Sequence, residues 1–570
     1  MRAALCLALL VSACDGAKGP APDVAPTASV QDPSDNRSLW FVDGSQAAGL
    51  ASFRNQSGSP DKDYITDSFG AGVALFDYDR DGDLDLYVIG GGSIASGTDQ
   101  GATQDALFAG DGTGKFRDVT QAAGIGPCGW TYGVCAADLD GDGWCDLYVT
   151  TQQSNTYWRN LGDGTFEDAT KAAGIGGREW SAGALAFDYD RDGDLDLWVT
   201  NHIDFDRASI EAEGKRGSYL GQAVYFGPGG LPGVADRLYA NQGDGTFRDR
   251  SIESGVTKHA LCGFQAVAVD VDQDGWLDVY VANDSQPNQL WHNQGDGTFI
   301  DKGLEYRAAL SVEGGPQAGM GVAVGDADGD GADDLFVTNF SEDYFTLYQG
   351  SVGGVFRDVT RRSHLMQPTL ASLGWASMFV DFDADGDVDL FAANGHVFPQ
   401  MDAVPAGPGY QQRNQVFENL GDGRFAIPAG EGGPGLLERG SHRGGAAGDV
   451  DGDGDMDLVI GRIDASPILL LNQGEGLGSS LWIDLVGAGA NPGAVGARIE
   501  VQVGDRSLSR TVGSQQGFLS SSAPAVHFGL GTASQVDRIK LTWPDGSQET
   551  FGPAAAGERL RLVQGAGRTE

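Results

Sequence analysis

One acidic pattern, D-x-D-x-D-G-x-x-D followed by Leu or Val, constrains this chain more than any other feature. It occurs seven times, beginning at Asp77, Asp138, Asp188, Asp270, Asp326, Asp381 and Asp449. Every copy is complete, with Asp at positions 1, 3, 5 and 9 and Gly at position 6. Internal repetition of this kind is typical of an array of one supersecondary unit that cannot bury its apolar face alone.

The residues around each acidic loop predict four strands per repeat. A short apolar run precedes the loop, as at 72–76, and another follows it, as at 147–150. A third run ends in an Asp-Gly turn, as at 157–164, and a fourth begins with Phe. Short runs of β-branched and aromatic residues between Gly turns are typical of strands and hairpins. Four strands per repeat predict a β-propeller blade.

The Phe of the fourth strand provides an independent count of the repeats. It occurs at Phe41, Phe116, Phe166, Phe247, Phe299, Phe356 and Phe425. Phe41 precedes the first acidic loop, whereas the last repeat, from Asp449 to about Asn472, has no fourth strand of its own. We therefore predict an all-β fold in which a seven-bladed β-propeller, residues 39–476, is closed by the N-terminal strand 39–43. Such closure leaves no sheet edge open.

The acidic loops end before residue 479, and the pattern of the chain changes. Residues 482–486, 497–503 and 538–543 alternate apolar and polar side chains and are separated by Gly and Pro turns. This pattern predicts strands and no helix. We expect a small C-terminal β domain over residues 479–563.

The crowded carboxylates of each loop predict a metal site. Hard divalent cations take oxygen ligands, and Ca²⁺ accepts six to eight of them in flexible geometry, whereas Mg²⁺ demands a stricter octahedron. The Gly at position 6 allows the sharp turn that brings the side chains together. An EF-hand is excluded, because its loop needs Glu at position 12, where this chain has only apolar residues.

We therefore predict up to seven structural Ca²⁺ ions, one per loop. The predicted ligands are Asp77, Asp79, Asp81 and Asp85; Asp138, Asp140, Asp142 and Asp146; Asp188, Asp190, Asp192 and Asp196; Asp270, Asp272, Asp274 and Asp278; Asp326, Asp328, Asp330 and Asp334; Asp381, Asp383, Asp385 and Asp389; and Asp449, Asp451, Asp453 and Asp457.

Charge and the N-terminus limit the partners and the location. The chain has 37 Lys and Arg against 80 Asp and Glu, a net charge of -43, which excludes binding to nucleic acid through its phosphates.

Residues 1–14 combine Arg2, a short apolar run and Val-Ser-Ala-Cys, a pattern typical of a bacterial signal peptide with a lipidated Cys14. Residues 15–38 predict a flexible tether. We expect a bacterial envelope lipoprotein or a secreted protein, in contact with a membrane only through its lipid anchor.

The four remaining cysteines leave their pairing open. Cys128, Cys135, Cys145 and Cys262 lie beyond the signal segment. Disulfides are permitted outside the cytoplasm, and four cysteines allow three connectivities.

Two insertions interrupt the repeats, at 202–236 and 395–412. Long loops on a rigid scaffold commonly carry function, and Tyr219, Tyr225 and Tyr410 are candidates for stacking on a glycan.

The chain contains no G-x-S-x-G, H-E-x-x-H or P-loop pattern, so we do not expect an enzyme. His396 is the histidine to test first if an activity is found.

The repeats resemble the FG-GAP/VCBS blades of integrin α-chain propellers, whose D-x-D-x-D-G-x-x-D loops hold Ca²⁺. The segments Val495-Gly496-Ala497-Arg498, His527-Phe528-Gly529-Leu530-Gly531 and Trp543-Pro544-Asp545-Gly546 resemble the ASPIC/UnbV domain. This combination is similar to the cartilage acidic protein family and its bacterial relatives. The resemblance implies a binding or adhesion module for an extracellular or envelope protein or a glycan. An envelope assembly protein and an enzyme with its site on the insertions remain alternatives.

Overall fold

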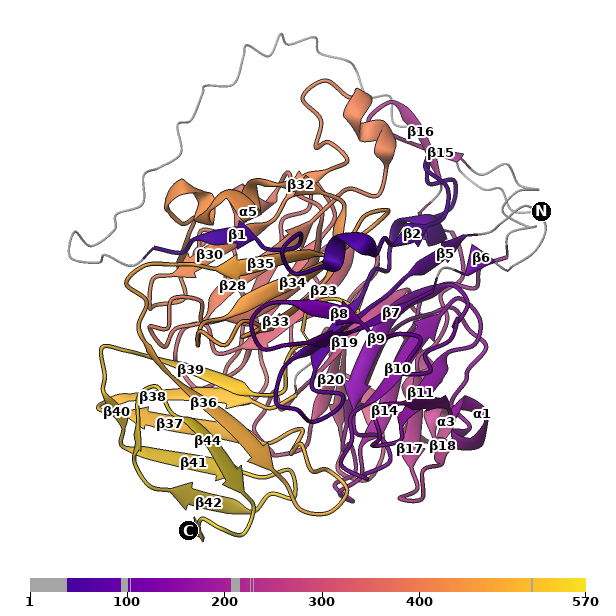
Figure 1. The fold of residues 1–570 in the computed structure, drawn as a ribbon. Helices are drawn as coiled ribbons and strands as arrows, with labels where there is room; N and C mark the ends of the chain where they lie inside the picture. Colours follow the sequence, from indigo (N-terminus) through magenta and orange to yellow (C-terminus); the bar gives the residue numbers. More distant parts are fainter. Residues whose placement is uncertain are drawn as a thin grey trace, which may run out of the picture. The chain divides into compact units, whose positions relative to one another are not determined.

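The computed structural model describes residues 38–93, 101–102, 104–206, 216–225, 227–228, 230–513 and 516–569. The predicted signal segment with Cys14, and the predicted tether except its last residue, lie outside the described residues. Within them the chain is mostly β, and seven sheets of four strands follow one another along the sequence (Figure 1).

In chain order the first three sheets are β3 (Val73–Phe76), β4 (Asp85–Val88), β7 (Ala106–Gly110) and β8 (Phe116–Asp118); β9 (Thr131–Ala137), β10 (Asp146–Thr151), β11 (Thr156–Asn160) and β12 (Phe166–Asp168); and β13 (Ser181–Phe187), β14 (Asp196–Asn201), β17 (Arg237–Asn241) and β18 (Phe247–Asp249). The next three are β19 (Gly263–Val269), β20 (Asp278–Asn283), β21 (Gln289–Asn293) and β22 (Phe299–Asp301); β23 (Gly319–Gly325), β24 (Asp334–Asn339), β25 (Thr346–Gln349) and β26 (Arg357–Asp358); and β27 (Gly374–Val380), β28 (Asp389–Asn394), β30 (Gln415–Asn419) and β31 (Phe425–Ala426).

The seventh sheet combines the two ends of the repeat array. It contains β33 (His442–Gly448), β34 (Asp457–Arg462), β35 (Ile468–Asn472) and, as its outer strand, β1 (Phe41–Asp43). Phe41 pairs with Asn472 and Asp43 with Leu470, in antiparallel register. The predicted pairing of the N-terminal strand with the last repeat is therefore present. The first strand of this sheet, β33, contacts both β27 and β3, the first strands of the sixth and first sheets.

The acidic loops all join the first strand of a sheet to its second. Phe76 pairs with Asp85 across the first loop, and Ala137 pairs with Asp146 across the second. The connection from the second strand to the third therefore lies at the opposite end of the second strand. Both long insertions are connections of this kind, because they follow β14 and β28.

The remaining elements are short and lie in the connections. Strands β2 (Gln56–Ser57), β5 (Gly91–Ser93) and β6 (Gly101–Ala102) form one small sheet, and β15 (Arg216–Tyr219) pairs with β16 (Gln222–Tyr225), as β29 (Gln412–Arg413) pairs with β32 (Arg439–Gly440). The short helices are η1 (Leu50–Ser52), η2 (Ile65–Ser68), α1 (Thr170–Ala173), α3 (Ser251–Ser254), η3 (Val256–Lys258), α4 (Met366–Thr369), η4 (Pro399–Ala403), η5 (Ala429–Gly432) and α5 (Pro434–Leu437). Among the described residues, no helix is long and apolar enough to cross a membrane.

The C-terminal residues form a separate set of sheets with their own core. The sheets are β39 (Val526–Gly531), β36 (Ser479–Val486) and β44 (Arg559–Val563); β38 (Arg506–Thr511), β37 (Arg498–Val503), β41 (Arg538–Thr542), β42 (Gln548–Phe551) and β45 (Arg568–Thr569); and β40 (Gln535–Val536) with β43 (Ala554–Ala555). Ile483, Ile499 and Trp543 lie in their shared apolar core. The expected β domain is therefore present, and its core is distinct from those of the repeats.

One connection of the C-terminal sheets, residues 516–523, lies among the first strands of the repeats; we call it the inner segment. Ser521 pairs with β3 by donating to Val73 O and accepting from Leu75 N, both at 3.0 Å. Val134 N on β9 donates to Leu519 O at 3.0 Å, and Gly445 N on β33 donates to Gly517 O at 2.7 Å. Phe518 is completely buried. The inner segment thus shares one core with strands more than 370 residues away along the chain.

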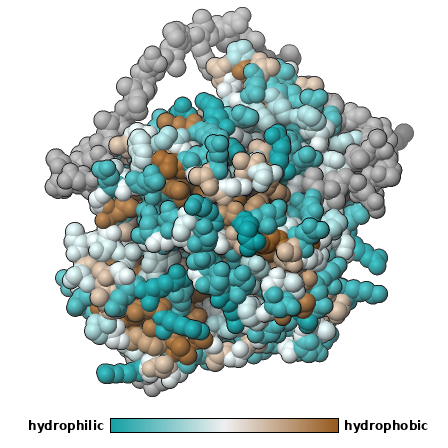
Figure 2. All heavy atoms as spheres, in the orientation of Figure 1, coloured by the Kyte–Doolittle hydropathy of each residue, from teal (hydrophilic) through white to brown (hydrophobic). Residues whose placement is uncertain are grey.

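Hydrophilic side chains cover much of the face seen in Figure 2, with smaller hydrophobic patches between them.

The thiols of Cys128, Cys145 and Cys262 are free. Cys128 Sγ instead lies 3.2 Å from the indole nitrogen of Trp158, which donates to it.

Candidate metal centres

The first aspartate of every acidic loop accepts a hydrogen bond from the glycine at position 6. The distances from the Gly N to the Asp Oδ2 run from 2.8 Å at Asp138 to 3.1 Å at Asp77, Asp188 and Asp449. The glycine has a positive φ in all seven loops, between 88° and 101°. Side chains other than Gly rarely adopt this conformation. The glycine is therefore required by the turn that folds the loop onto its first carboxylate.

The ninth aspartate ties the loop to the sheet. In the second repeat, Asp146 Oδ2 accepts from Leu139 N at 3.0 Å and Asp146 Oδ1 accepts from Asn160 N on the third strand at 2.7 Å. The same two bonds recur in all seven repeats. Asp146 is fully buried, and this burial raises its pKa to about 8. The carboxylate therefore holds the loop shape whether or not it also binds an ion.

Oxygen atoms at positions 1 and 3 remain without a hydrogen-bond partner. Oδ1 of Asp77, Asp138, Asp188, Asp190, Asp272, Asp328 and Asp451 is buried and unpartnered. Buried polar atoms without partners are rare in proteins and call for a missing ligand or water. Carboxylate oxygens from positions 1, 3 and 5 or 1, 3 and 9 lie within 4.8 Å of one another in several loops. The donor set is all oxygen and fits a hard divalent cation.

Burial also perturbs the first aspartates. Loss of solvent, aided by the neighbouring carboxylates, raises the pKa of Asp138 to about 7 and that of Asp188 to about 6. A nearby cation would reverse this, because opposite charge favours the ionised form. The loops are thus strained electrostatically in the absence of positive charge.

The third strand contributes an asparagine that sequence reasoning did not assign to the site. Asn160 Nδ2 donates to Cys145 O in its own repeat at 3.1 Å and to Tyr78 O, at position 2 of the preceding loop, at 2.9 Å. Asn241, Asn293, Asn419 and Asn472 make the same contact with a preceding repeat. The recurring Asn before a Gly turn was the available indication, but the pattern alone suggested only a hairpin.

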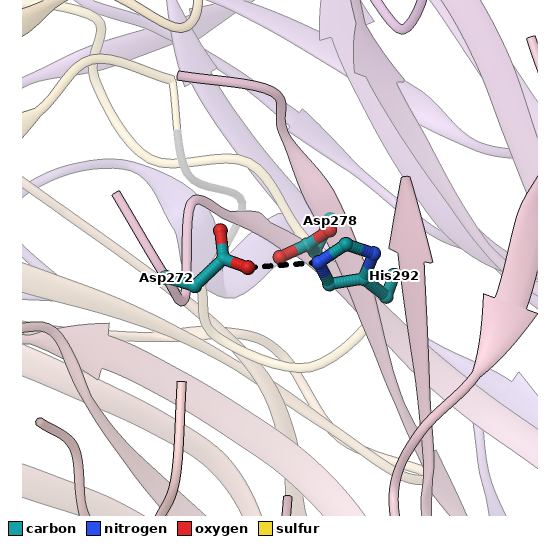
Figure 3. A group of neighbouring side chains, drawn as sticks. All are labelled: Asp272, Asp278 and His292. Atoms are coloured by element: carbon teal, nitrogen blue, oxygen red, sulfur yellow. Dashed lines mark hydrogen bonds and ion pairs between the residues drawn. The ribbon is translucent and has the colours of Figure 1, made fainter. Parts of the chain in front are cut away.

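The residue before this asparagine faces position 3 of the acidic loop and differs between repeats. His292 Nε2 lies 2.8 Å from Asp272 Oδ2, and Asp278 completes the group (Figure 3). Gln349 donates to Asp328 at the equivalent place, and Arg159 lies 3.9 Å from Asp140. The sequence pattern alone did not mark His292 as part of the site. The seven loops therefore share the same loop hydrogen bonds but differ in the third-strand side chain that contacts position 3.

The residues predicted on the insertions do not form exposed platforms. Tyr225 is only 6% exposed, packs on Phe398 and bonds to Ser68 through its hydroxyl, so the expectation of an exposed stacking ring is wrong for Tyr225. Tyr219 and Tyr410 are half-buried. His396 is completely buried between Ser341 and the backbone N–H of Phe398, and burial lowers its pKa to about 3. These side chains pack the insertions onto the sheets.

The model of the FG-GAP-like repeat matches residues 77–149, 138–199, 270–337, 326–392 and 400–460, more than half of the chain. The chain belongs to the FG-GAP-like repeat family. A second model, ASPIC and UnbV, matches residues 487–569 after the FG-GAP repeats. The expected combination of domains is confirmed.

The FG-GAP repeats and the C-terminal domain are together similar to cartilage acidic protein 1. The human protein is 27% identical over 556 residues, which cover 92% of this chain and 77% of the relative. The mouse and Xenopus tropicalis proteins are 27% identical over 311 and 306 residues, and these alignments span less than half of each relative. This is distant homology.

Solved structures show weaker likenesses. An Agrocybe aegerita lectin described as recognising non-reducing terminal N-acetylglucosamine has a TM-score of 0.37 at 17% identity, covering 68% of this chain and 88% of the lectin. BBS1N, solved in complex with ARL6DN, has a TM-score of 0.39 at 9% identity, covering 76% and 96%. Both TM-scores are below 0.5, so neither likeness carries a functional argument.

Proposed function

We propose that the seven FG-GAP sheets form a closed seven-bladed β-propeller that binds Ca²⁺ and acts outside the cytoplasm as a binding module for a protein or a glycan. The pairing of β1 with β35 and the contacts of β33 with both β3 and β27 support closure. A ring closed in this way has no free sheet edge in the array.

The observation that carries the metal proposal is the repeated set of unpartnered carboxylate oxygens. Positions 1 and 3 present buried Oδ1 atoms in loop after loop, and the backbone N–H groups of each loop already bond to other oxygens. Bound Ca²⁺ would supply the positive charge that these carboxylates lack and so stabilise the loop. The acidic loops are structural in this proposal, because each belongs to its own sheet.

The two insertions are the proposed recognition surface. They extend from second strands at the end opposite the acidic loops, and buried contacts such as Tyr225 with Phe398 pack one insertion against the other. Binding residues commonly lie on such loops, which a rigid scaffold holds in place. A lipid on Cys14 would tether the module to a bacterial envelope, and a Cys14→Ser variant that stays in the membrane fraction after detergent-free washing would contradict this.

A single-loop substitution tests the metal proposal. Asp188 is 5% exposed and keeps one oxygen unpartnered, so Asp188→Asn should remove about one calcium per chain by elemental analysis. Asp194→Asn in the same loop lies at position 7, where no side-chain ligand is proposed, and should keep the full calcium content. Equal calcium in both variants would refute the assignment.

A pulldown from envelope extracts tests the binding role. The full chain should capture a protein or glycan partner in calcium and lose it in excess chelator. Capture that is independent of calcium, or none at all, would contradict a calcium-stiffened binding module.

A further inference from the structure

A cavity of about 330 Å³ lies at the end of the strands opposite the acidic loops. Its walls come from residues that follow the second strands β20, β24 and β28, together with η2, β16 and the beginnings of β19, β23 and β27. Both insertions contribute, through Tyr225 and Phe398. The cavity is therefore assembled from distant parts of the repeat array and belongs to none of the seven metal loops.

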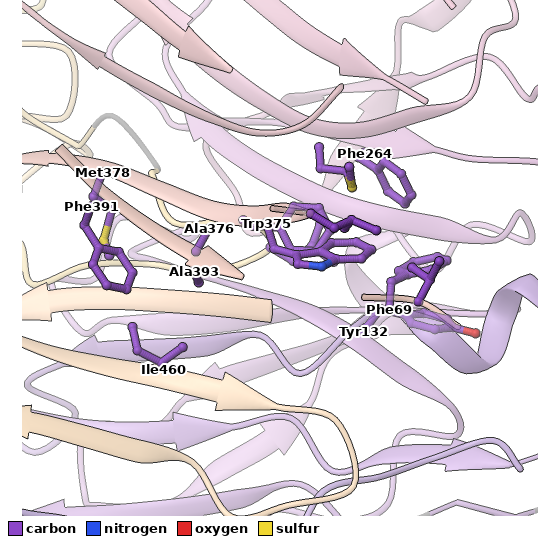
Figure 4. Close-up of a cluster of buried hydrophobic side chains, with 14 of the residues drawn as sticks. Phe69, Tyr132, Phe264, Trp375, Ala376, Met378, Phe391, Ala393 and Ile460 are labelled. Carbon is purple, nitrogen blue, oxygen red and sulfur yellow. The ribbon is translucent and has the colours of Figure 1, made fainter. Parts of the chain in front are cut away.

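Aromatic rings form two sides of this cavity. Phe69 and Phe264 meet edge to face at 5.1 Å between ring centroids, and Phe264 meets Trp375 at 6.2 Å. These three rings lie near one another in Figure 4. On another side, Phe398 contacts Tyr225 at 4.8 Å and Phe340 at 6.3 Å. The faces of aromatic rings are electron-rich and attract cations.

Two carboxylates complete the lining. Asp284 accepts a 2.8 Å hydrogen bond from Ser285 Oγ, and Asp343 accepts a long one, 3.5 Å, from Ala318 N. In the described part of the chain neither carboxylate has an ion pair, and no Lys, Arg or His lines the cavity. Loss of solvent raises the pKa of Asp284 to about 6 and also raises that of Asp343. Negative charge is thus placed beside the rings without a positive partner.

The same aromatic group already stabilises one buried cation. The Arg443 guanidinium lies 4.1 Å from the centroid of the Trp375 ring and is completely buried. Its N–H groups donate only to backbone carbonyls, those of Ser68, Gly395, His442 and His396. It does not line the cavity. The Trp375 ring therefore contacts a positive charge without a carboxylate, whereas the cavity offers rings and carboxylates together.

We propose that this cavity binds a small organic cation, an alkylammonium group of about the size of choline. Aromatic rings with nearby carboxylates, and no Lys, Arg or His in the lining itself, match the chemistry that recognises such ions. The cavity volume lies at the small end of ligand sites in proteins, which favours a compact ligand. The site is separate from the acidic loops and does not depend on the proposed partner of the binding module.

Calorimetric titration of the calcium-saturated full chain with choline tests the proposal. Choline should bind saturably, and its neutral carbon isostere 3,3-dimethyl-1-butanol should bind at least about tenfold more weakly. Equal binding of the two compounds, or no saturable binding of choline, would overturn it.

Variants separate charge from ring chemistry. Asp343→Asn should weaken choline binding about tenfold, and Phe340→Leu, which keeps apolar volume but removes the ring, should weaken it about fivefold. Neither should alter the weak binding of the isostere. Glu305→Gln, an exposed acid away from the lining, is the matched control and should bind choline normally. If Asp343→Asn loses calcium or melts at a lower temperature, Asp284→Asn takes its place in the experiment. If either of these two variants is folded and binds choline with unchanged affinity, the proposal is refuted.

Discussion

The two ends of the second strands carry opposite chemistry. Where each second strand begins, seven nearly identical acidic loops present buried carboxylate oxygens such as Asp188 Oδ1. Where the second strands end, two unique insertions bring together aromatic side chains around one cavity. The difference teaches that the repeated residues form the scaffold, whereas the residues that depart from the repeat line one cavity.

The largest expected effect comes from removing the ions of the acidic end. Each site occupied at one hundred times its dissociation constant contributes about 2.7 kcal/mol of stability. Excess chelator should therefore lower the melting temperature by more than about 10 °C in calorimetry. A single transition that shifts as a whole would show that the two ends unfold together. An unchanged melting curve would contradict the metal proposal.

The pH dependence of the metal-free protein is the next largest effect. Burial raises the pKa of Asp85 and Asp146 from the ordinary 3.8 to about 8, so the folded chain binds protons that the unfolded chain has released. Stability should then be greatest at low pH and fall as the pH rises from 3.8 towards 8. Calorimetry in chelator should show this fall between pH 5 and pH 8.

Calcium should reverse that dependence, because the ion binds the ionised carboxylates. The difference in melting temperature between calcium and chelator should therefore grow as the pH rises. A difference that shrinks with pH would contradict the view that ions and protons compete for the same loops.

A smaller effect should come from the contacts between repeats. Asn160→Ala removes the hydrogen bonds to Tyr78 O and Cys145 O, and should cost about 1–3 kcal/mol of stability because buried carbonyls lose their donors. Calcium content should stay the same. Asp163→Ala, in the exposed turn of the same hairpin, is the control and should cost less. If both variants lose the same free energy of unfolding, the Asn160 hydrogen bonds do not stabilise the contact between repeats.

The smallest effect concerns one loop among the seven. His292 lies against Asp272 where the next repeat has Gln349 against Asp328. Imidazole suits transition metals better than an amide does. The Gln294 amide nitrogen lies 2.7 Å from His292 Nδ1, and a flip of this amide would let its oxygen accept from Nδ1 and leave Nε2 free to bind a metal. His292→Gln should therefore abolish visible absorption from added Co²⁺ while calcium content stays constant. Absorption that survives the substitution would place Co²⁺ elsewhere.

Sequence alone predicted the repeated parts well. The four strands of each sheet, the pairing of the N-terminal strand with the last repeat and the acidic loops follow from local patterns such as Gly82 among five crowded carboxylates. Repetition made these patterns visible. The strands of the C-terminal domain were likewise predicted from the alternation of apolar and polar side chains within residues 479–563.

The rest depends on contacts between residues far apart in the chain. The contact of His292 with Asp272 spans two strands, and the cavity joins Phe69 to Phe264 and Trp375 from separate sheets. Nothing in the local sequence of 516–523 indicates burial among the first strands of the repeats. Tyr225 was a candidate for stacking on a glycan because it lies in a long insertion, yet it packs against Phe398 from the other insertion.

The inner segment has a consequence for how the chain matures. Phe518 and Leu519 complete a core whose other members begin near Leu39, so almost the entire polypeptide must exist before that core can close. Contacts this distant in sequence make folding slow. A growing chain would therefore expose unpaired strands and an unfilled centre until residues 516–523 have been made, which favours folding after synthesis of the whole chain.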